Sequence, residues 1–600
     1  MPTTIFDDPE QEAVLADESP RLLVTSPPGS GKTFTAIRLA ARDVAAGRAN
    51  PSRHVLVLTF SRAARAQLER YAESLLSPEE RRCLEITNYH SFFWSKIFQF
   101  RQALGLPLDL EIGTDQQHQQ DVLGSMARAG FPEPTASQRT GALRDYSAAL
   151  EYGQDFALPA RFEGAPPERL NEVADALLRV HRGGRIHYDD FAHYMWRLAD
   201  ESATLRAIWQ WKYPVMILDE FQDASPMQAA IVRRIAPPPH RVYAFADPLQ
   251  MIYGWRDASP LRLEEFRTDD ASEHTLRTLH RYREQPALQQ WMEQVRDVLL
   301  GDRERVDVER PGEVQVISYD PAAPERGKVY GAPARELWQL RDPISTAFAG
   351  GTIRSIGVFA RKRNQIPVLM RSLTQSFRCG LLGDADATAD WIREWINGYP
   401  ASLTVEHHAA RLLDVAEMIA PRHPLLADLR ARLCPTGIRT DRLRPERRAL
   451  ADQLNQLAAQ CATLPEALSS VRQTARLAIN GQDARVVAWE RERVLRRVVH
   501  VLPGSTDEDA RAQVEGRILQ LRSASEGAPQ RGLFVLSCHE GKGKEFDLAI
   551  LPWVSSENFD DDAESRQLLY VSLTRGRKRI IVRLANGEVP PICFRLGLAP

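Results

Sequence analysis

The chain has little lysine, little cysteine and no long apolar run, and each shortage excludes a class of protein. Eight of its 77 basic residues are lysine, and 79 acidic residues leave a net charge of -2. Overall charge therefore does not indicate a nucleic-acid-binding protein, and any polyanion track must be local. The six cysteines are scattered without a C-x-x-C pair, which favours reduced thiols and gives no zinc-binding pattern.

No apolar run approaches the roughly 18 residues that suggest a membrane span. The first residues, MPTTIFDDPEQEAV, are acidic and do not resemble a secretory signal peptide. A chain of 600 residues, 43% of them hydrophobic, is too long for one hydrophobic core. We therefore expect a cytoplasmic protein of several domains that does not contact a membrane.

Short β-branched runs alternate with helical stretches in two groups. The first group comprises residues 21–26, 54–60, 84–87, 214–220 and 241–247, and the second comprises residues 313–319, 355–361, 532–538, 548–554 and 579–585. This alternation is typical of βαβ units in a buried parallel sheet. The sequence therefore predicts an α/β fold with two parallel-sheet cores.

Each predicted core is interrupted by a long segment without strand-like runs. Both segments are rich in Ala, Leu, Arg, Gln and Glu, and residues 166–182 and 447–460 carry apolar residues at helical spacing. We therefore expect two largely helical insertions. The predicted domains are a first core at 1–91 and 187–277, its insertion at 92–186, a second core at 278–379 and 529–600, and its insertion at 380–528.

The stretch LLVTSPPGSGKTFT, residues 22–35, resembles a phosphate-binding loop between a strand and a helix. Such a loop directs backbone N–H groups at an anion near the positive end of the helix dipole. Ser26 replaces the leading glycine of the usual G-x-x-x-x-G-K-[ST] pattern, and two prolines follow it. The predicted donors are intact: Gly29, Ser30, Gly31, Lys32 and Thr33. Alone, the stretch is also compatible with a Gly/Pro turn that carries an exposed lysine.

A second stretch, PVMILDEFQDAS, is an apolar strand that ends in Asp219 and Glu220. Ligands of parallel sheets bind beyond the carboxyl ends of the strands, where both carboxylates are expected. With the Thr33 hydroxyl, Asp219 would hold Mg²⁺, and Glu220 would orient or deprotonate an attacking water. The pair of stretches together predicts a site for ATP and Mg²⁺.

These stretches and four later ones carry a family resemblance. VMILDEFQDAS and YAFADPLQMIYGWRDAS, followed by TLHRYREQP, SCHEGKGKEFD and ESRQLLYVSLTRGR in the same order, resemble the superfamily-1 helicases of the UvrD/Rep/PcrA type. The resemblance covers both predicted cores and not visibly the insertions. It implies two RecA-like cores that hydrolyse ATP between them.

The resemblance also implies roles for single residues in the nucleotide site. They are adenine recognition by Gln11, adenine stacking by Tyr282, γ-phosphate contacts by Arg283 and Gln250, a ribose contact by Glu545 and an arginine finger at Arg575. The catalytic set is thus Lys32, Glu220, Gln250, Arg283 and Arg575. Gly576 is expected to end a helix and so to seat the guanidinium of Arg575 at that helix end. Without the resemblance, the sequence would indicate only that Arg575 belongs to a basic run with Arg577, Lys578 and Arg579.

A second set of residues points to single-stranded nucleic acid. Tyr253, Trp255 and Arg256 place two aromatic rings and a guanidinium in one loop, and bases stack on such rings regardless of sequence. In the resembled family the same face includes positions that match Phe60, His90 and His539. Taken singly, an aromatic residue is more often part of a core, and a histidine is more often an ordinary polar residue.

The sequence departs from the family pattern in four places. Lys544 stands where an apolar residue is common, Glu540 where a small one is usual, Arg281 where asparagine precedes the Tyr-Arg pair, and Phe34 where arginine is frequent. These changes bear on nucleotide discrimination and strand affinity. They remove no catalytic carboxylate, lysine or finger.

The leading interpretation is an ATP-dependent motor that moves 3′→5′ on single-stranded DNA and at single-strand/double-strand junctions, in repair, recombination or anti-phage defence. The alternative is a regulatory DNA-stimulated ATPase, which works with a nuclease or another subunit and unwinds little by itself. A fused nuclease is not expected, because 25 residues follow Arg575. Stacking does not distinguish DNA from RNA, so both remain open.

Overall fold

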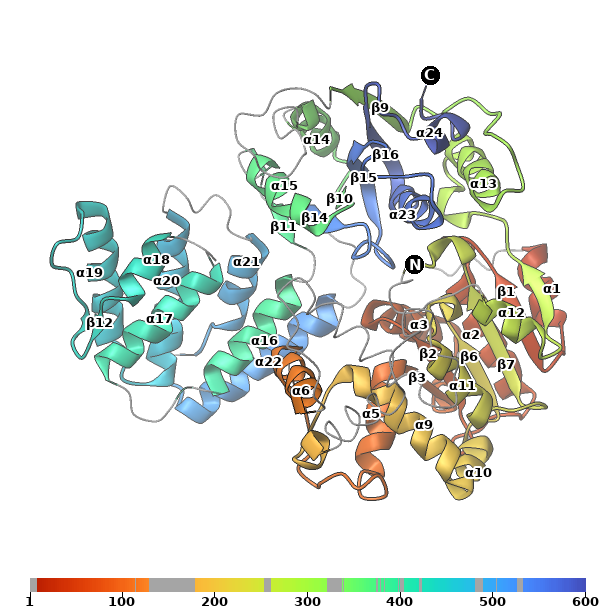
Figure 1. Cartoon of the computed structure of the whole chain (residues 1–600), viewed down its shortest axis with the longest axis horizontal. Helices are drawn as coiled ribbons and strands as arrows, with labels where there is room; N and C mark the ends of the chain where they lie inside the picture. Colours follow the sequence, from red (N-terminus) through yellow and green to blue (C-terminus); the bar gives the residue numbers. More distant parts are fainter. Residues whose placement is uncertain are drawn as a thin grey trace. The chain divides into compact units, whose positions relative to one another are not determined.

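The computed structural model describes residues 8–113, 115–128, 179–252, 261–320, 337, 339–373, 376–377, 379–381, 384–397, 399, 404–419, 424–480, 489–502, 504–525 and 532–599. The chain divides into two compact units, residues 1–281 and 282–600. Each unit contains a six-stranded sheet in which every pairing is parallel (Figure 1). The prediction of an α/β fold with two parallel-sheet cores is confirmed.

The sheet of the first unit has the strand order β3-β2-β6-β7-β1-β8. Its strands are β1 (Arg21–Thr25), β2 (Val55–Thr59), β3 (Leu84–Asn88), β6 (Val215–Leu218), β7 (Arg241–Ala246) and β8 (Ser272–Thr275). Five of them match predicted runs. β8 was missed because its sequence, SEHT, is polar, as an edge strand with half-covered side chains allows.

Alternating side chains of this sheet face two different cores. Leu22 and Val24 of β1 lie in a core covered by α1, α2 and α3, whereas Leu23 joins the core formed with α5, α9 and α11. The helices of the unit are α1 (Pro9–Ala16), α2 (Lys32–Ala45), α3 (Arg62–Leu75), α4 (Pro78–Arg81), α5 (Tyr89–Gln99), α6 (Asp115–Arg128), α9 (Phe191–Glu201), α10 (Ala203–Lys212), α11 (Pro226–Ile235) and α12 (Leu261–Arg267). Burial on both faces explains why the strands are continuously apolar.

The described part of the first insertion does not have a separate core. Its buried residues Leu104, Leu110 and Ile186 belong to the same apolar cluster as α5, α9 and the sheet. It also contains a two-stranded parallel sheet, β4 (Glu111–Ile112) with β5 (Arg185–Ile186), which the sequence did not indicate. Most of the helical pattern at residues 166–182 lies outside the described residues.

The sheet of the second unit has the order β11-β14-β10-β15-β16-β9. Its strands are β9 (Val314–Tyr319), β10 (Ser355–Ala360), β11 (Cys379–Leu381), β14 (Gly532–Ser537), β15 (Phe546–Val554) and β16 (Gly576–Ala585). The three-residue edge strand β11 was not predicted, because so short a run carries no periodic signal. Helices α13 (Pro286–Leu300), α14 (Arg341–Ala349), α15 (Ile366–Leu373), α23 (Ala563–Leu573) and α24 (Pro591–Arg595) accompany this sheet.

The helices of the second insertion form a bundle with a core of its own. They are α16 (Asp384–Asn397), α17 (Val405–Ile419), α18 (Pro424–Arg430), α19 (Pro445–Ala459), α20 (Leu464–Asn480), α21 (Trp489–Val498) and α22 (Asp507–Ser525) (Figure 1). Buried residues from Ala389 to Ile518 make one continuous apolar cluster. A short antiparallel pair, β12 (Leu433–Cys434) with β13 (Gly437–Ile438), packs on α17 and α19. Within the described residues, no helix is long and apolar enough to cross a membrane.

Candidate nucleotide site

The predicted phosphate loop connects β1 to α2. Gly31 is the N-cap residue of α2 and has φ 91°, and Gly29 has φ 87°, so two residues of the loop need the left-handed conformation that glycine adopts most easily. The Ser30 hydroxyl donates to the Pro27 carbonyl at 2.9 Å, and this hydrogen bond closes a turn over residues 27–30 at the start of the loop. Ser26 is fully buried and its N–H donates to Ala246 of β7. A small side chain is therefore sufficient where the usual pattern has glycine.

The loop is enclosed by two other segments of the first unit. A Cβ atom added to Gly29 would lie 2.6 Å from the Cβ of Arg281, whose N–H donates to the Gly29 carbonyl at 3.2 Å. A Cβ atom added to Gly31 would lie 2.4 Å from the amide nitrogen of Gln11. Close approach and backbone conformation therefore both require glycine at position 29, whereas a side chain at position 31 would be strained by its positive φ and would displace the end of Gln11. Arg281, noted above as a departure from the family pattern, lies against the loop.

Gln11 on α1 is held in place by a small polar network. Its side-chain amide donates to the Ser30 carbonyl at 3.1 Å and lies 3.3 Å from Nε2 of His280. The same His280 nitrogen is 2.6 Å from a carboxylate oxygen of Asp8. The Gln11 Oε1 atom is buried and has no hydrogen-bond partner among the described residues. An acceptor in this position fits the amino edge of adenine.

The two predicted carboxylates follow β6. Asp219 is 2% exposed and accepts a 3.0 Å hydrogen bond from the Thr59 hydroxyl at the end of β2. Glu220 has a left-handed backbone, with φ 55° and ψ 38°, and its Oε1 atom accepts from the Lys32 ammonium at 2.9 Å. The lysine of the phosphate loop and the acidic pair are thus brought together, as expected from their strand-end positions.

Charge at this edge of the sheet is unbalanced. Burial of the Lys32 ammonium opposes its charge, but the carboxylates of Glu220, Asp247 and Asp219 raise its pKa. Burial and the neighbouring Glu220 raise the pKa of Asp219 to about 6. One ammonium faces three carboxylates, so a divalent cation with oxygen ligands fits the donor set. Asp219 and the half-buried Thr33 are the residues that would hold Mg²⁺.

A chain of hydrogen bonds connects Glu220 to Gln250, the predicted γ-phosphate sensor. The Gln222 amide donates to Glu220 Oε2 at 2.6 Å, and its oxygen accepts from the Asp247 N–H at 3.0 Å. The Gln250 amide donates to Asp247 Oδ2 at 2.8 Å. Gln222 lies in η3 (Phe221–Asp223) and Gln250 in η4 (Pro248–Gln250), which follow β6 and β7. The sequence reading missed Gln222 and Asp247, although both lie inside the stretches that it singled out.

The remaining predicted nucleotide residues belong to the second unit. Arg283 is exposed and Glu545 is half-buried directly before β15. Tyr282 is 1% exposed, and its hydroxyl donates to the Gly576 carbonyl at 3.1 Å. Stacking on adenine would require this ring to be uncovered.

Arg575 is 2% exposed and is hydrogen-bonded to residues of its own unit. Its guanidinium donates to the carbonyls of Val571 and Lys544 and to the Thr574 hydroxyl, at 2.8, 3.3 and 2.8 Å. The guanidinium therefore sits at the end of α23. The expectation for Gly576 is wrong, because α23 ends at Leu573 with Thr574 as its C-cap and Gly576 begins β16. A Cβ on Gly576 would lie 2.6 Å from the Arg579 carbonyl, so close backbone approach requires the glycine.

The predicted nucleic-acid residues are described only in part. Phe60 follows β2 and its ring lies 4.7 Å from that of Tyr89. His90 is the second residue of α5 and its ring is 5.9 Å from that of Tyr188. His539 follows β14 in the second unit, with Nε2 3.9 Å from a Glu564 oxygen. Tyr253, Trp255 and Arg256 lie outside the described residues.

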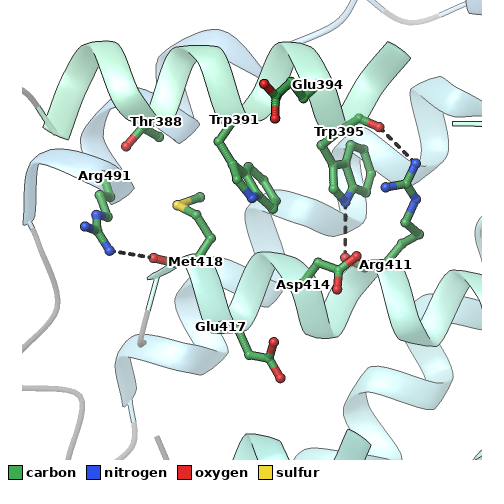
Figure 2. A pocket seen from close by; sticks show the side chains of 9 residues that line it. All are labelled: Thr388, Trp391, Glu394, Trp395, Arg411, Asp414, Glu417, Met418 and Arg491. Carbon is green, nitrogen blue, oxygen red and sulfur yellow. Dashed lines mark hydrogen bonds between the residues drawn. The ribbon is translucent and has the colours of Figure 1, made fainter. Parts of the chain in front are cut away.

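A separate cavity of about 590 Å³ lies in the second insertion, between α16, α17 and α21 (Figure 2). Trp391 and Trp395 stack along one wall, with ring centroids 6.4 Å apart. Asp414 and Glu417 on the opposite wall are both paired with Arg430. None of the predicted nucleotide or nucleic-acid residues lines this cavity.

Comparison with known proteins gives the family. The UvrD/REP helicase N-terminal domain matches residues 7–271, and the UvrD-like helicase C-terminal domain matches residues 532–582. ATP-dependent DNA helicase PcrA of Leuconostoc citreum is 26% identical over 304 residues, covering 47% of this chain and 37% of the relative.

Two further relatives agree with this assignment. DNA helicase II of Escherichia coli is 25% identical over 294 residues, which cover 46% of this chain and 38% of the relative. RecBCD enzyme subunit RecB of Mycolicibacterium smegmatis is 25% identical over 364 residues, which cover 52% of this chain and 32% of the relative. The matched parts span less than two-fifths of the length of these relatives. The two domain matches and the helicase relatives place the chain in one family: it belongs to the superfamily-1 UvrD-like helicases.

Proposed function

We propose that this chain is an ATP-dependent DNA helicase or translocase that moves 3′→5′ on single-stranded DNA. The observation that carries the proposal is the hydrogen-bonded chain from Lys32 through Glu220, Gln222 and Asp247 to Gln250. It joins the phosphate loop, the acidic strand end and the next strand end of one sheet. Three separate motifs thus converge on the place where a triphosphate would bind.

In the proposed mechanism, the residues of the first unit act in sequence. Gln11 orients the adenine, and a bound phosphate competes with Glu220 for the Lys32 ammonium. Once released from the lysine, Glu220 positions and deprotonates the attacking water. Gln222 holds the second oxygen of Glu220, so the orientation of this base depends on Asp247 and Gln250. Mg²⁺, when bound near Asp219 and Thr33, would neutralise charge on the phosphates.

The second unit supplies the remaining proposed roles. Arg575 serves as the arginine finger, Arg283 contacts the γ-phosphate, Tyr282 stacks on the base, and Glu545 bonds the ribose. An arginine finger accelerates related reactions by about 10³–10⁵-fold. Because it comes from a different core than the phosphate loop, hydrolysis would depend on movement of the two cores, which couples chemistry to translocation.

The experiment that tests the proposal measures ATPase with and without single-stranded DNA, for the native chain and for Glu220→Gln. We expect DNA to raise ATPase many-fold, and Glu220→Gln to abolish turnover while DNA binding remains. Duplexes with a 3′ overhang should then be opened and those with a 5′ overhang should not. ATPase that is indifferent to DNA would contradict the motor function.

A second candidate is a regulatory DNA-stimulated ATPase in a repair or defence complex, with a nuclease or another subunit as partner. The similarity to RecB, which is named as a subunit of a larger enzyme, favours it. DNA-stimulated ATPase without strand separation on either tailed duplex would support this candidate. Strand separation by the isolated chain would exclude it.

A further inference from the structure

A cluster of histidines and carboxylates lies where α6 of the first insertion meets the segment that directly follows that insertion, and it is separate from the proposed nucleotide site. His118 lies on α6, and His187, Asp189 and Asp190 lie in and beside η2 (Tyr188–Asp190), which leads into α9. One ligand atom from each of His118, His187 and Asp189 lies within 4.8 Å of the others. His118 and His187 are buried, and Asp189 is half-exposed, so the group has one side open to solvent.

Distances within the group suit a small cation. An oxygen of Asp189 is 3.6 Å from Nε2 of His118 and 3.4 Å from Nδ1 of His187. Zinc bonds of about 2.0–2.1 Å in a tetrahedron correspond to ligand–ligand separations of about 3.3–3.4 Å. Both measured separations are within a few tenths of an ångström of that value. From these three side chains we propose a binding site for a divalent transition-metal ion, with Zn²⁺ as the representative ion.

A further carboxylate lies beside the three proposed ligands. Asp190 directly follows Asp189 in the sequence and is 1% exposed. Asp190 accepts from the backbone N–H of His187 at 2.7 Å and lies 3.2 Å from Nε2 of His181. This carboxylate therefore holds the backbone of one ligand residue in place.

Independent contacts hold the two ligand-bearing segments together. Arg185 forms two hydrogen bonds with Asp121, at 3.0 and 2.9 Å, and so ties β5 to α6. Asp121 lies three residues after His118, on the same side of α6. The pairing of β4, which precedes α6 in the chain, with β5, which precedes η2, also holds these two segments together. The fold therefore positions the segments that carry the ligands, whether or not an ion is bound.

Metal binding would require a local change of ring orientation. The His118 and His187 rings are stacked, with centroids 4.0 Å apart and 14° between their planes, so the in-plane lone pairs of the two rings lie in nearly parallel planes rather than meeting at one point. Nδ1 of His187 also accepts the Asp189 N–H at 3.3 Å. The outer torsion of histidine is broad, so the rings can turn toward one ion about that bond. Binding would exchange the stack and this long hydrogen bond for two metal–nitrogen bonds.

The chemistry of the ligands separates this site from the Mg²⁺ site. Imidazole nitrogen suits zinc, cobalt, nickel and copper, whereas Mg²⁺ prefers carboxylate and water. Three protein ligands leave a fourth position for water. The site requires no cysteine, which is why the scattered cysteines gave no indication of it.

The test uses the untagged full chain, stripped with chelator and titrated with Zn²⁺ by calorimetry, with Co²⁺ absorption as a report of coordination. We expect one ion per chain. Asp189→Asn and His118→Gln should each weaken binding at least tenfold, and His193→Gln, on the adjoining α9, should not. Because Asp189 is half-exposed, its substitution leaves the fold intact. ATPase measured with Mg²⁺ should remain unchanged in Asp189→Asn.

Two results would overturn the proposal. One is Zn²⁺ binding to the native chain no tighter than to the His118→Gln/Asp189→Asn double variant. The other is a tetrahedral Co²⁺ spectrum that persists in that double variant. Neither result bears on the proposed helicase function, which depends on residues of the nucleotide site.

Discussion

Replacing Asp219 with asparagine is expected to stabilise the chain against unfolding while it abolishes ATP hydrolysis. Asp219 is buried beside Glu220, and burial together with that carboxylate raises its pKa from 3.8 to about 6. The folded protein therefore holds this proton more tightly than the unfolded chain does. Between these two pKa values the free energy of unfolding falls as the pH rises, and the penalty is complete above the higher one.

The size of the effect follows from the shift. One pKa unit corresponds to about 1.4 kcal/mol, so a shift of about two units costs at most about 3 kcal/mol at pH 8. The pKa of about 6 already includes the opposing effects of Lys32 and Thr59, which favour the charged form of Asp219. We therefore expect Asp219→Asn to raise the free energy of unfolding by about 1–3 kcal/mol at pH 8. For a unit as large as residues 1–281, each kcal/mol raises the midpoint temperature of unfolding by about 2–4 °C, so we expect a rise of several degrees.

The assay compares thermal unfolding of the native chain and Asp219→Asn without nucleotide and with chelator, at pH 8 and at about pH 5.5. The stabilisation should be largest at pH 8 and smaller at the lower pH. Asp17→Asn is the matched control, because burial opposes ionisation of Asp17 but hydrogen bonds from Ser272, Ser19 and His274 lower its pKa. That substitution should destabilise the protein. A destabilising or pH-independent effect of Asp219→Asn would refute the reasoning.

Three other substitutions probe the site. Gly29→Ala should reduce kcat/KM for ATP at least tenfold, because it combines a positive φ with a 2.6 Å clash, whereas Gly47→Ala, at φ 70° with open space around it, should leave ATPase unchanged. Gln222→Leu should lower kcat about 10–100-fold with little change in KM. It removes the hydrogen bond from Gln222 to Glu220, the proposed general base, which is worth about 1.5–3 kcal/mol. Arg575→Lys should lower kcat about 10³-fold. Arg583→Lys, which alters an equally buried guanidinium of the same unit, should lower the unfolding midpoint without that loss; equal kcat losses in both would contradict the finger role.

The central strands of both sheets could be predicted because their signal is local. Strands such as Val55–Thr59 and Ser355–Ala360 are buried on both faces and are therefore continuously apolar. The edge strands β8 and β11 could not be predicted, because one is polar and the other has three residues. Their strand conformation depends on pairing with β1 and β14, which are distant in the sequence.

The candidate nucleotide site also combines features with a local sequence signal and features that depend on residues distant in the sequence. The phosphate loop and the acidic pair follow from short patterns whose letters correspond to backbone geometry. The connection through Gln222 and Asp247 depends on two strand ends that lie side by side in the sheet, and no spacing in the sequence records it. The cluster of His118 and His187 is still less accessible to sequence reading, because its members are separated by most of the first insertion.

The backbone conformation of Glu220 explains how the side chains of two neighbouring residues, Asp219 and Glu220, can lie at the same site. Successive side chains of a strand point to opposite faces, so a continued strand would direct the carboxylates of Asp219 and Glu220 apart. The strand ends at Leu218, and the left-handed conformation of Glu220 breaks the alternation. A non-glycine residue in this conformation costs about 1 kcal/mol or more. Interaction with Lys32 and Gln222 offsets that strain, so the strained turn and the pairing of Glu220 with the phosphate-loop lysine depend on each other.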